Sequence, residues 1–140
     1  MAQQLRDIMT RQVHTVRTDA SLLAVARIMR DQRIGDVLVT EDDGTLCGII
    51  TDRDIVVRAV AAGMPLDRTR AGDICSGDLI QVDENASVEE CVAIMREHAI
   101  RRVPVVDGDK PIGIVSIGDL ARCKDPGSAL AEISAAVPNN

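Results

Sequence analysis

The sequence contains the stretch Gly48-Ile49-Ile50-Thr51-Asp52-Arg53-Asp54-Ile55 and repeats it, with substitutions, as Gly113-Ile114-Val115-Ser116-Ile117-Gly118-Asp119-Leu120. In both copies a glycine and two aliphatic residues precede a hydroxyl residue, and an aspartate follows three positions after that hydroxyl. The aliphatic run predicts a strand, and the hydroxyl with the later aspartate is typical of the start of a helix. The stretch is therefore expected to be a strand-to-helix junction that occurs twice in the fold.

The repetition extends well beyond this junction. Residues 6–9 match 72–75 and residues 20–30 match 86–96 at a shift of 66 residues, whereas the junctions are 65 residues apart. The missing residue falls in the turn before Gly48, where a deletion is easily accommodated. Two copies of one unit usually pack together, because each alone leaves an apolar face uncovered. We therefore expect two units about a pseudo-two-fold axis and two related versions of any ligand site near it.

Hydrophobic periodicity predicts the order β-α-β-β-α in each repeat, which is an α/β (α+β) fold. Ser21 is expected to cap the first helix, and Ser87 with Glu90 forms the S-x-x-E pattern of a capping box before the matching helix. The predicted elements of the first repeat are a strand at 15–16, a helix from 22 that ends before Gly35, strands at 37–39 and 46–50, and a helix from 51–52 to Gly63. In the second repeat the later strands are predicted at 103–106 and 112–115.

These elements divide the chain into four parts. The predicted parts are a first repeat at 5–63, a linker at 64–71, a second repeat at 72–124 and a short C-terminal tail at 125–140. The linker is polar and bounded by glycines, so it is expected to cross the surface. Within the tail we expect one weak helix at 128–135 and a frayed end at 137–140.

Composition narrows the class of protein. The chain has 140 residues, 46% apolar residues, a net charge of −6 and no Phe, Tyr or Trp. A nucleic-acid surface is not expected, because clustered positive charge and aromatic rings for base stacking are both missing. No stretch approaches the roughly 20 apolar residues that span a bilayer, and the first residues lack a signal-peptide core. We expect a cytoplasmic globular protein that contacts neither nucleic acid nor membrane.

Catalytic and metal sites have little support in the sequence. Four cysteines (Cys47, Cys75, Cys91, Cys123) lack the C-x-x-C spacing, and neither His14 nor His98 lies beside one. Buried thiols that pack as small apolar residues are the favoured interpretation, although ligands distant in sequence can still meet in space. No Ser-His-Asp or Cys-His arrangement has a plausible spacing. We therefore predict no enzyme, no catalytic residues and no metal site.

The duplicated junction is the best candidate for a binding site. A hydroxyl at the first turn of a helix lies beside free backbone amides and the positive end of the helix dipole, so Thr51 and Ser116 can help to hold a phosphate. The carboxylates of Asp54 and Asp119 can accept hydrogen bonds from a ribose diol. The same pattern is also a helix-capping box that binds no ligand. Both readings stay open, because a duplication preserves caps as readily as sites.

The combined pattern closely resembles a pair of CBS domains, also called a Bateman module, over residues 5 to 124. The residues that carry the resemblance are Asp7-Ile8-Met9, Ala20-Ser21-Leu22, Ile28-Met29, Val37-Leu38-Val39 and the junction at 48–55, with their partners Ala86-Ser87-Val88, Ile94-Met95, Val103-Pro104-Val105-Val106 and the junction at 113–120.

The resemblance implies a regulatory module that binds adenosine-containing ligands in clefts between its two sheets. AMP, ADP or ATP is the expected ligand, with S-adenosylmethionine as an alternative, and many members of the family dimerise. Carried over by position, Thr51 and Ser116 would contact phosphate or ribose, and Asp54 and Asp119 would hold the ribose hydroxyls. The adenine would lie near Val13 and Val37 in one cleft and near Leu79 and Val103 in the other.

The two repeats differ where the family often places basic residues. Arg101-Arg102 in the second copy matches Gly35-Asp36 in the first, and Arg53 matches Gly118. If phosphates need these guanidinium groups, the two clefts are not equivalent. Arg101 and Arg102 are equally well read as a solvated surface pair. A second hypothesis is a ligand-free module whose sheets build a dimer surface, which filled clefts would favour.

Overall fold

The computed structural model describes residues 3–75, 79–125 and 127–135 and divides into two compact units. His14–Leu79 form one, called the first unit below. The other, the second unit, combines Met1–Val13 with Ile80–Asn139. Each unit holds a three-stranded sheet with its own helices, as the β-α-β-β-α prediction requires. The predicted frayed end at 137–140 lies outside the described residues.

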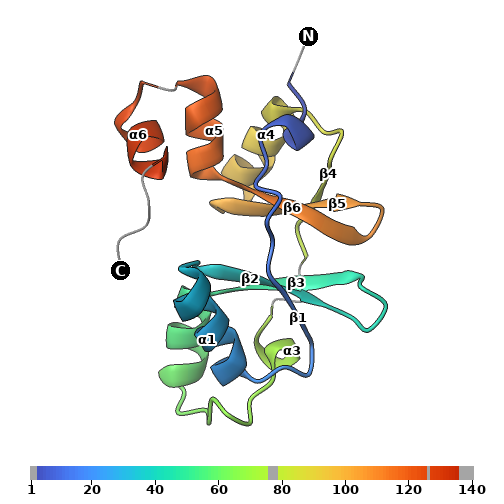
Figure 1. Ribbon diagram of the computed structural model, residues 1–140, viewed down its shortest axis with the longest axis vertical. Helices are drawn as coiled ribbons and strands as arrows, with labels where there is room; N and C mark the ends of the chain where they lie inside the picture. Colours follow the sequence, from blue (N-terminus) through green and yellow to red (C-terminus); the bar gives the residue numbers. More distant parts are fainter. Residues whose placement is uncertain (1–2, 76–78, 126, 136–140) are drawn as a thin grey trace. The chain divides into compact units, whose positions relative to one another are not determined.

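In the first unit the sheet has the strand order β1-β2-β3, with β1 parallel to β2 and β2 antiparallel to β3. Figure 1 shows α1 and α3 on the same face of this sheet. The elements are β1 (Thr15–Arg17), α1 (Leu22–Gln32), β2 (Asp36–Thr40), β3 (Leu46–Thr51), α2 (Asp52–Asp54), the π-helix η2 (Ile55–Val60) and α3 (Ala71–Ile74).

The second unit repeats this plan with the strand order β4-β5-β6. Its helices α4 and α5 cover one face of the sheet, and α6 lies against α5 (Figure 1). The elements are the 3-10 helix η1 (Leu5–Asp7), β4 (Val82–Asp83), α4 (Val88–His98), β5 (Arg102–Asp107), β6 (Lys110–Ser116), α5 (Ile117–Lys124) and α6 (Ala129–Ala135). The weak helix predicted in the tail is thus present.

Each unit is built around a separate apolar core. In the first unit the helix residues Leu22, Val25 and Met29, which recur on one face of α1, pack against Val37 and Ile50 of the sheet. In the second unit the corresponding residues of α4 pack against β5 and β6. The aliphatic periodicity of the sequence therefore identified the buried faces correctly.

The opening segments of the two repeats are exchanged between the two units. Leu5 and Met9, at the start of the first repeat, belong to the core of the second unit, and Leu5 is completely buried there. Ala71, the last residue of the linker, and Ile74, at the start of the second repeat, belong to the core of the first unit. Sequence matching places 6–9 and 72–75 in equivalent positions but does not say which sheet each one covers.

The helix ends agree with the prediction only in part. α1 ends before Gly35, as predicted, but the residue that adopts the left-handed conformation at its end is Arg33, with φ of 56°. Ala99 ends α4 in the same way, with φ of 54°. At Ser87 only half of the predicted capping box is present, because its hydroxyl accepts a hydrogen bond from Glu90 N while the reciprocal carboxylate bond is not formed. Gly63 does adopt a positive φ, of 73°, after η2.

The linker is more firmly attached than a surface crossing requires. The side chain of Thr69 is buried and donates to the carbonyl of Pro65 over 2.7 Å. The carbonyls of Leu66 and Thr69 accept backbone hydrogen bonds from Leu23 and Leu22 at the start of α1. Leu66 also packs against the first core. The linker therefore holds the N-terminal end of α1, although most of its side chains are exposed.

Candidate functional site

The junction of the first unit is a complete capping box. At the end of β3 the backbone N–H of Thr51 donates to Asp54 Oδ2 over 2.9 Å, and the backbone N–H of Asp54 donates to Thr51 Oγ1 over 3.1 Å. The N–H of Asp52 donates to the carbonyl of Gly35 at 3.0 Å, which ties the start of α2 to the residue before β2. These bonds fix both side chains of the predicted site.

The junction of the second unit repeats this framework. Ser116 N donates to Asp119 Oδ2 at 2.9 Å, and Asp119 N donates to Ser116 Oγ at 3.2 Å. Ile117 N donates to the carbonyl of Arg101 at 2.9 Å, in the place that Gly35 takes in the first unit. The reading of the pattern as a helix cap is therefore correct at both junctions. Whether a ligand also binds depends on which hydrogen-bonding groups of these side chains are not used by the cap.

The two aspartates differ in whether their carboxylate oxygens already accept hydrogen bonds from other groups of the protein. Asp119 is only 4% exposed; its Oδ1 accepts a hydrogen bond from the guanidinium of Arg122, and Thr10 Oγ1 lies 3.5 Å from its Oδ2. Asp54 is half-buried, and within the described part of the chain its only acceptor bond comes from Thr51 N. The residue three positions after Asp54 is Val57, whose side chain cannot donate a hydrogen bond. One carboxylate oxygen of Asp54 is thus open and both oxygens of Asp119 are engaged.

Two of the three predicted arginines, Arg101 and Arg102, lie at the junction of the second unit. Arg102 pairs with Ser116 across β5 and β6, and Arg101 is exposed directly before it. In the first unit Asp36 takes the matching position opposite Thr51. Arg53 is exposed in the first turn of α2. Each junction therefore carries a cationic side chain, but from different elements: β5 and the residue before it in the second unit, α2 in the first.

The aliphatic residues predicted to contact the adenine are placed less favourably for binding it. Val37 and Val103 are both completely buried, each in the core of its own unit. Their side chains belong to the packing of the sheets and offer no exposed surface to a base. Val13 and Leu79 are half-buried, at the ends of the segments where the chain passes from one unit to the other.

Sequence reasoning missed Arg122 and Thr10. The Asp119–Arg122 spacing of three residues within a helix is a recognised ion-pair spacing and could have been noticed. The contact of Thr10 with Asp119 could not, because it joins residues 109 positions apart. Thr10 also exchanges two backbone hydrogen bonds with Ile114, of 2.8 and 2.9 Å, and so holds the N-terminal segment along β6.

Other features lie away from the junctions. A surface groove of about 350 Å³ is lined by Glu89, Val92, Ala93, Arg96 and Lys124 on α4 and α5, none of which is a predicted site residue. Glu89 Oε1 and Lys124 Nζ form an ion pair of 2.8 Å there. This pair lowers the pKa of the carboxyl and raises that of the ammonium group, through a hydrogen bond in each case. It is solvent-exposed and so contributes little to stability.

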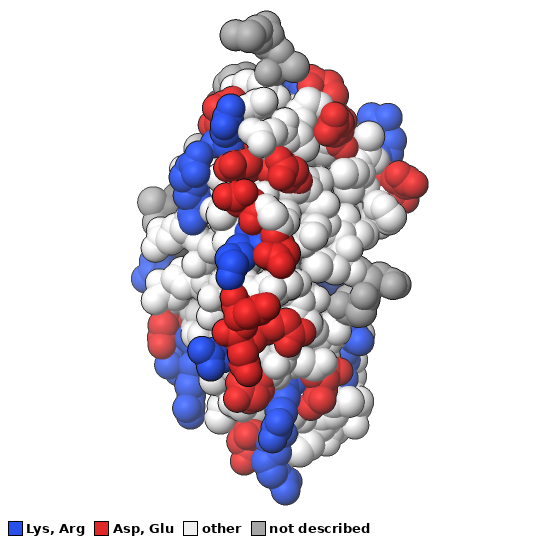
Figure 2. All heavy atoms as spheres, turned by 90° about the vertical axis from the view of Figure 1, so that its right-hand side faces the viewer, with Lys and Arg blue, Asp and Glu red and all other residues white. Residues whose placement is uncertain are grey.

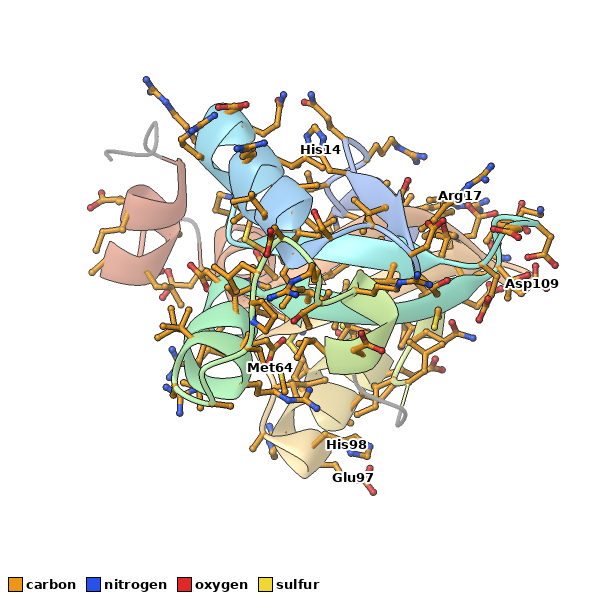
Figure 3. All side chains as sticks on the ribbon, turned by 90° about the horizontal axis from the view of Figure 1, so that it is seen from below. His14, Arg17, Met64, Glu97, His98 and Asp109 are labelled. Atoms are coloured by element: carbon orange, nitrogen blue, oxygen red, sulfur yellow. The ribbon has the colours of Figure 1, made fainter. Side chains whose placement is uncertain are left out.

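Histidines and acidic groups do not converge on a metal site in the described ranges. No group of three or more His, Cys, Asp or Glu side chains with suitable geometry occurs among residues 3–75, 79–125 and 127–135. His98 follows Glu97 at the C-terminal end of α4, where both side chains extend into solvent (Figure 3). His98 is thus placed to interact with the helix dipole, as its position at the end of the helix predicts.

The surface charge is mixed. On the face drawn in Figure 2, basic side chains lie among acidic ones and form no continuous basic area in the part of the chain that is described. Such interspersed charges do not produce the strong positive potential that nucleic-acid binding requires. None of the described helices has both the length and the apolar character needed to cross a bilayer.

Comparison with known proteins agrees with the residue pattern. The CBS domain family model matches residues 5–60 and 71–125. Hypoxic response protein 1 of Mycobacterium tuberculosis is 41% identical over 117 residues, which cover 84% of this chain and 82% of that protein. A crystal structure of that protein, described as having two coordinated zinc ions, has a TM-score of 0.79 at 40% identity and covers 86% of this chain and 98% of its own.

Two other solved structures share the fold. The CBS domain pair of protein MJ0100, in complex with 5′-methylthioadenosine and S-adenosyl-L-methionine, has a TM-score of 0.77 at 27% identity and covers 88% of this chain and 96% of its own. A hexameric CBS-CP12 protein from bloom-forming cyanobacteria has a TM-score of 0.78 at 27% identity, with coverages of 90% and 74%.

Proposed function

The chain belongs to the CBS domain family, and we propose that this regulatory CBS pair binds an adenosine-containing ligand, with AMP, ADP or ATP favoured over S-adenosylmethionine. It acts by changing a dimer or a partner protein rather than by catalysis. A nucleotide sensor of this kind would work in the cytoplasm, where these nucleotides are abundant.

One observation carries the proposal: the open carboxylate oxygen of Asp54. The capping box holds the other oxygen at 2.9 Å from Thr51 N, so the side chain is oriented before any ligand arrives. A carboxylate with a free oxygen is a strong acceptor for the adjacent hydroxyls of a ribose. Arg53, in the same turn, is exposed, and its guanidinium group can reach a phosphate of the ligand.

The similarity to the MJ0100 pair supports this choice of ligand. That protein was crystallised with two compounds that both contain adenosine. What they share is the adenosine moiety, and a carboxylate such as Asp54 would recognise its ribose. Because the chain has no aromatic residue to stack on the base, we expect affinity of roughly micromolar to millimolar.

The two junctions are proposed to differ in occupancy. A ligand at Asp119 would have to displace the Arg122 guanidinium from Oδ1 and reach a side chain that is 4% exposed. A ligand at Asp54 displaces no protein group in the described part of the chain. We therefore expect the first unit to bind more tightly, although the second unit carries Arg101 and Arg102.

Isothermal titration calorimetry with AMP, ADP, ATP and S-adenosylmethionine tests the proposal. Asp54→Asn keeps an oxygen for Thr51 N but removes the charge, and should weaken binding at least tenfold. Asp52→Asn is the matched control, because the Asp52 side chain is exposed and bonds only Arg53 N in the described chain, so this variant should bind the ligand normally. Silence of the wild-type protein towards all four ligands at millimolar concentration would overturn the proposal.

A second candidate function is a ligand-free dimeric interaction module. The observation that favours it is an apolar surface on the helix after Asp54, where Val56, Val57 and Val60 are 58%, 47% and 53% exposed. An exposed apolar surface of this kind is commonly buried against the same surface of a second copy of the chain. Under either function we propose a homodimer that buries these valines.

Light scattering after size-exclusion chromatography tests the dimer. Val60→Glu should shift the protein towards a monomer, whereas Ile133→Glu, at a residue that is 71% exposed on α6, should not. A wild-type protein that is monomeric at all concentrations, or a Val60→Glu variant that remains dimeric, would contradict this assembly. A dimer without any nucleotide binding would leave the interaction module as the better account.

A further inference from the structure

Two of the four cysteines lie in contact, although they are far apart in the sequence. Cys47 Sγ and Cys75 Sγ are 3.9 Å apart, both residues are half-buried, and both thiols are free. Cys91 is buried in α4, and the Cys123 thiol donates to Gln3 Oε1 over 2.7 Å. Among the cysteines, all of which are described, Cys47 and Cys75 thus form the thiol pair, and the other two serve as internal controls.

The elements on either side hold the two sulfur atoms in place. Cys47 lies in β3, and Cys75 directly follows α3. Cys75 N donates to the carbonyl of Ala71 at 3.0 Å, and Gly72 N donates to the carbonyl of Thr18 at 2.8 Å, so the end of α3 is attached within the first unit. A disulfide needs about 2.0 Å between sulfurs, which a change of side-chain rotamer reaches from van der Waals contact.

We propose that Cys47 and Cys75 form a redox modification site, at which hydrogen peroxide converts the two thiols into an intramolecular disulfide. This proposal does not depend on nucleotide binding. It concerns the first unit alone, because both cysteines lie within His14–Leu79.

The order of events follows from the surroundings of the two thiols. Burial, the hydrogen bond with Cys75 and the nearby Glu41 raise the pKa of the Cys47 thiol to about 11, so Cys47 stays protonated at neutral pH. The thiolate of Cys75 attacks one peroxide oxygen, the O–O bond breaks, and hydroxide leaves and becomes water. The product is a sulfenic acid on Cys75.

In the second step the Cys47 sulfur attacks the Cys75 sulfur. The S–O bond breaks, the hydroxyl group takes the thiol proton and leaves as water, and the S–S bond forms. Two thiols and one peroxide thus give one disulfide and two waters, with the two sulfurs oxidised and the peroxide oxygens reduced.

The disulfide would act on the segment that carries the candidate binding residues. It joins positions 28 residues apart, and the closed loop contains Thr51, Asp54, α2 and η2. A cross-link of this kind restricts the unfolded chain more than the folded one. Oxidation is therefore expected to raise the melting temperature of the first unit.

Peroxide titration of the full chain tests the site. The wild-type protein should fall from four titratable thiols to two in denaturant, lose two hydrogens in intact mass, and yield a Cys47–Cys75 peptide after digestion without reductant. Cys91→Ser should form the same cross-link. Cys47→Ser should form none and should instead accumulate a sulfenic acid on Cys75, which dimedone traps.

Circular dichroism of each reduced variant shows whether it is folded before oxidation. Because Cys47 and Cys75 are half-buried, the conservative change to serine should leave the fold intact. The proposal is wrong if all four thiols survive peroxide that fully oxidises a free dithiol. It is also wrong if the mapped disulfide joins other cysteines or two chains.

Discussion

The carboxylates of Asp54 and Asp119 occupy matching positions but have different neighbours. Both accept a hydrogen bond from the residue that caps their helix, yet only Asp119 also accepts one from an arginine. The Arg122 side chain is 43% exposed, so solvent screens this ion pair on the side of the guanidinium group. It still competes directly with any ligand hydroxyl for the same oxygen. Arg122 is thus one residue that distinguishes two caps with the same backbone hydrogen bonds.

Exchanging Arg122 and its counterpart Val57 should change the number of nucleotides bound per chain. Arg122→Val gives the second junction the residue found at Val57, and should raise the calorimetric stoichiometry from one to two nucleotides per chain. Val57→Arg makes the reverse change and should weaken binding at Asp54 by several-fold. Two equal sites in the wild-type protein would contradict this role of Arg122 while leaving the proposed function intact.

Gly113 illustrates a different constraint on a single residue. A Cβ added there would lie 2.6 Å from Met9 Sδ and 3.0 Å from the carbonyl oxygen of Thr10. The sulfur can move, but the backbone oxygen belongs to a residue that exchanges hydrogen bonds with Ile114. The glycine of this junction therefore admits the N-terminal segment of the chain itself.

Gly113→Ala should lower the free energy of unfolding by about 1–3 kcal/mol through overpacking. Urea denaturation followed by circular dichroism measures the change. Gly127→Ala is the control, because no atom of the described residues lies within 4 Å of an added Cβ there. Equal stability of the two variants would show that Met9 and Thr10 move aside without cost.

At the scale of elements, α1 and α4 each end on a residue with a strained backbone conformation. Arg33 and Ala99 adopt the left-handed region, with φ of 56° and 54°, where a side chain with a Cβ is disfavoured. Each N–H bonds back to the carbonyl of a methionine, Met29 in α1 and Met95 in α4. The ending is therefore imposed by the turn into the next strand rather than by a glycine.

Ala99→Gly should raise the free energy of unfolding by about 0.5–1 kcal/mol, because glycine adopts this conformation without strain. Ala93→Gly, at an exposed position inside α4, should lower it by about 1 kcal/mol. Each change replaces one alanine by glycine, so both have the same effect on the unfolded chain. Denaturant melts that shift in the same direction for both variants would rule out the φ explanation.

At the scale of the whole molecule, the chain crosses between its two units more often than the repeats suggest. Residues up to Val13 complete the second unit, and the segment at 71–75 completes the first. Each unit thus needs residues from outside its own repeat to fill its core. A fragment cut at the repeat boundaries would lack part of the core that it needs.

Leu5→Ala should destabilise the second unit by about 2–5 kcal/mol, since Leu5 is completely buried in that core. Hydrogen exchange measured by mass spectrometry should then accelerate in β5 and β6 more than in β2 and β3. Ile74→Ala, which is 2% exposed in the other core, should have the opposite distribution. Faster exchange in β2 and β3 for Leu5→Ala would contradict the exchanged arrangement.

The sequence by itself determined the duplication, the order of elements, the buried faces of α1 and α4, the caps at Thr51 and Ser116 and the family. These properties depend on local spacing: a period of 3.6 residues for helices, aliphatic runs for strands and fixed offsets for caps. Repetition strengthened each of them, because the same local signal occurred twice.

Only the tertiary structure decided which sheet each N-terminal segment covers, which carboxylate oxygen stays open and which thiols meet. These depend on contacts between residues far apart in the chain, such as Cys47 with Cys75 or Thr10 with Asp119. It also buried Val37 and Val103 completely, where family position alone suggested contact with a base. Local sequence spacing carries no information about such contacts, because chain topology and packing bring their partners together.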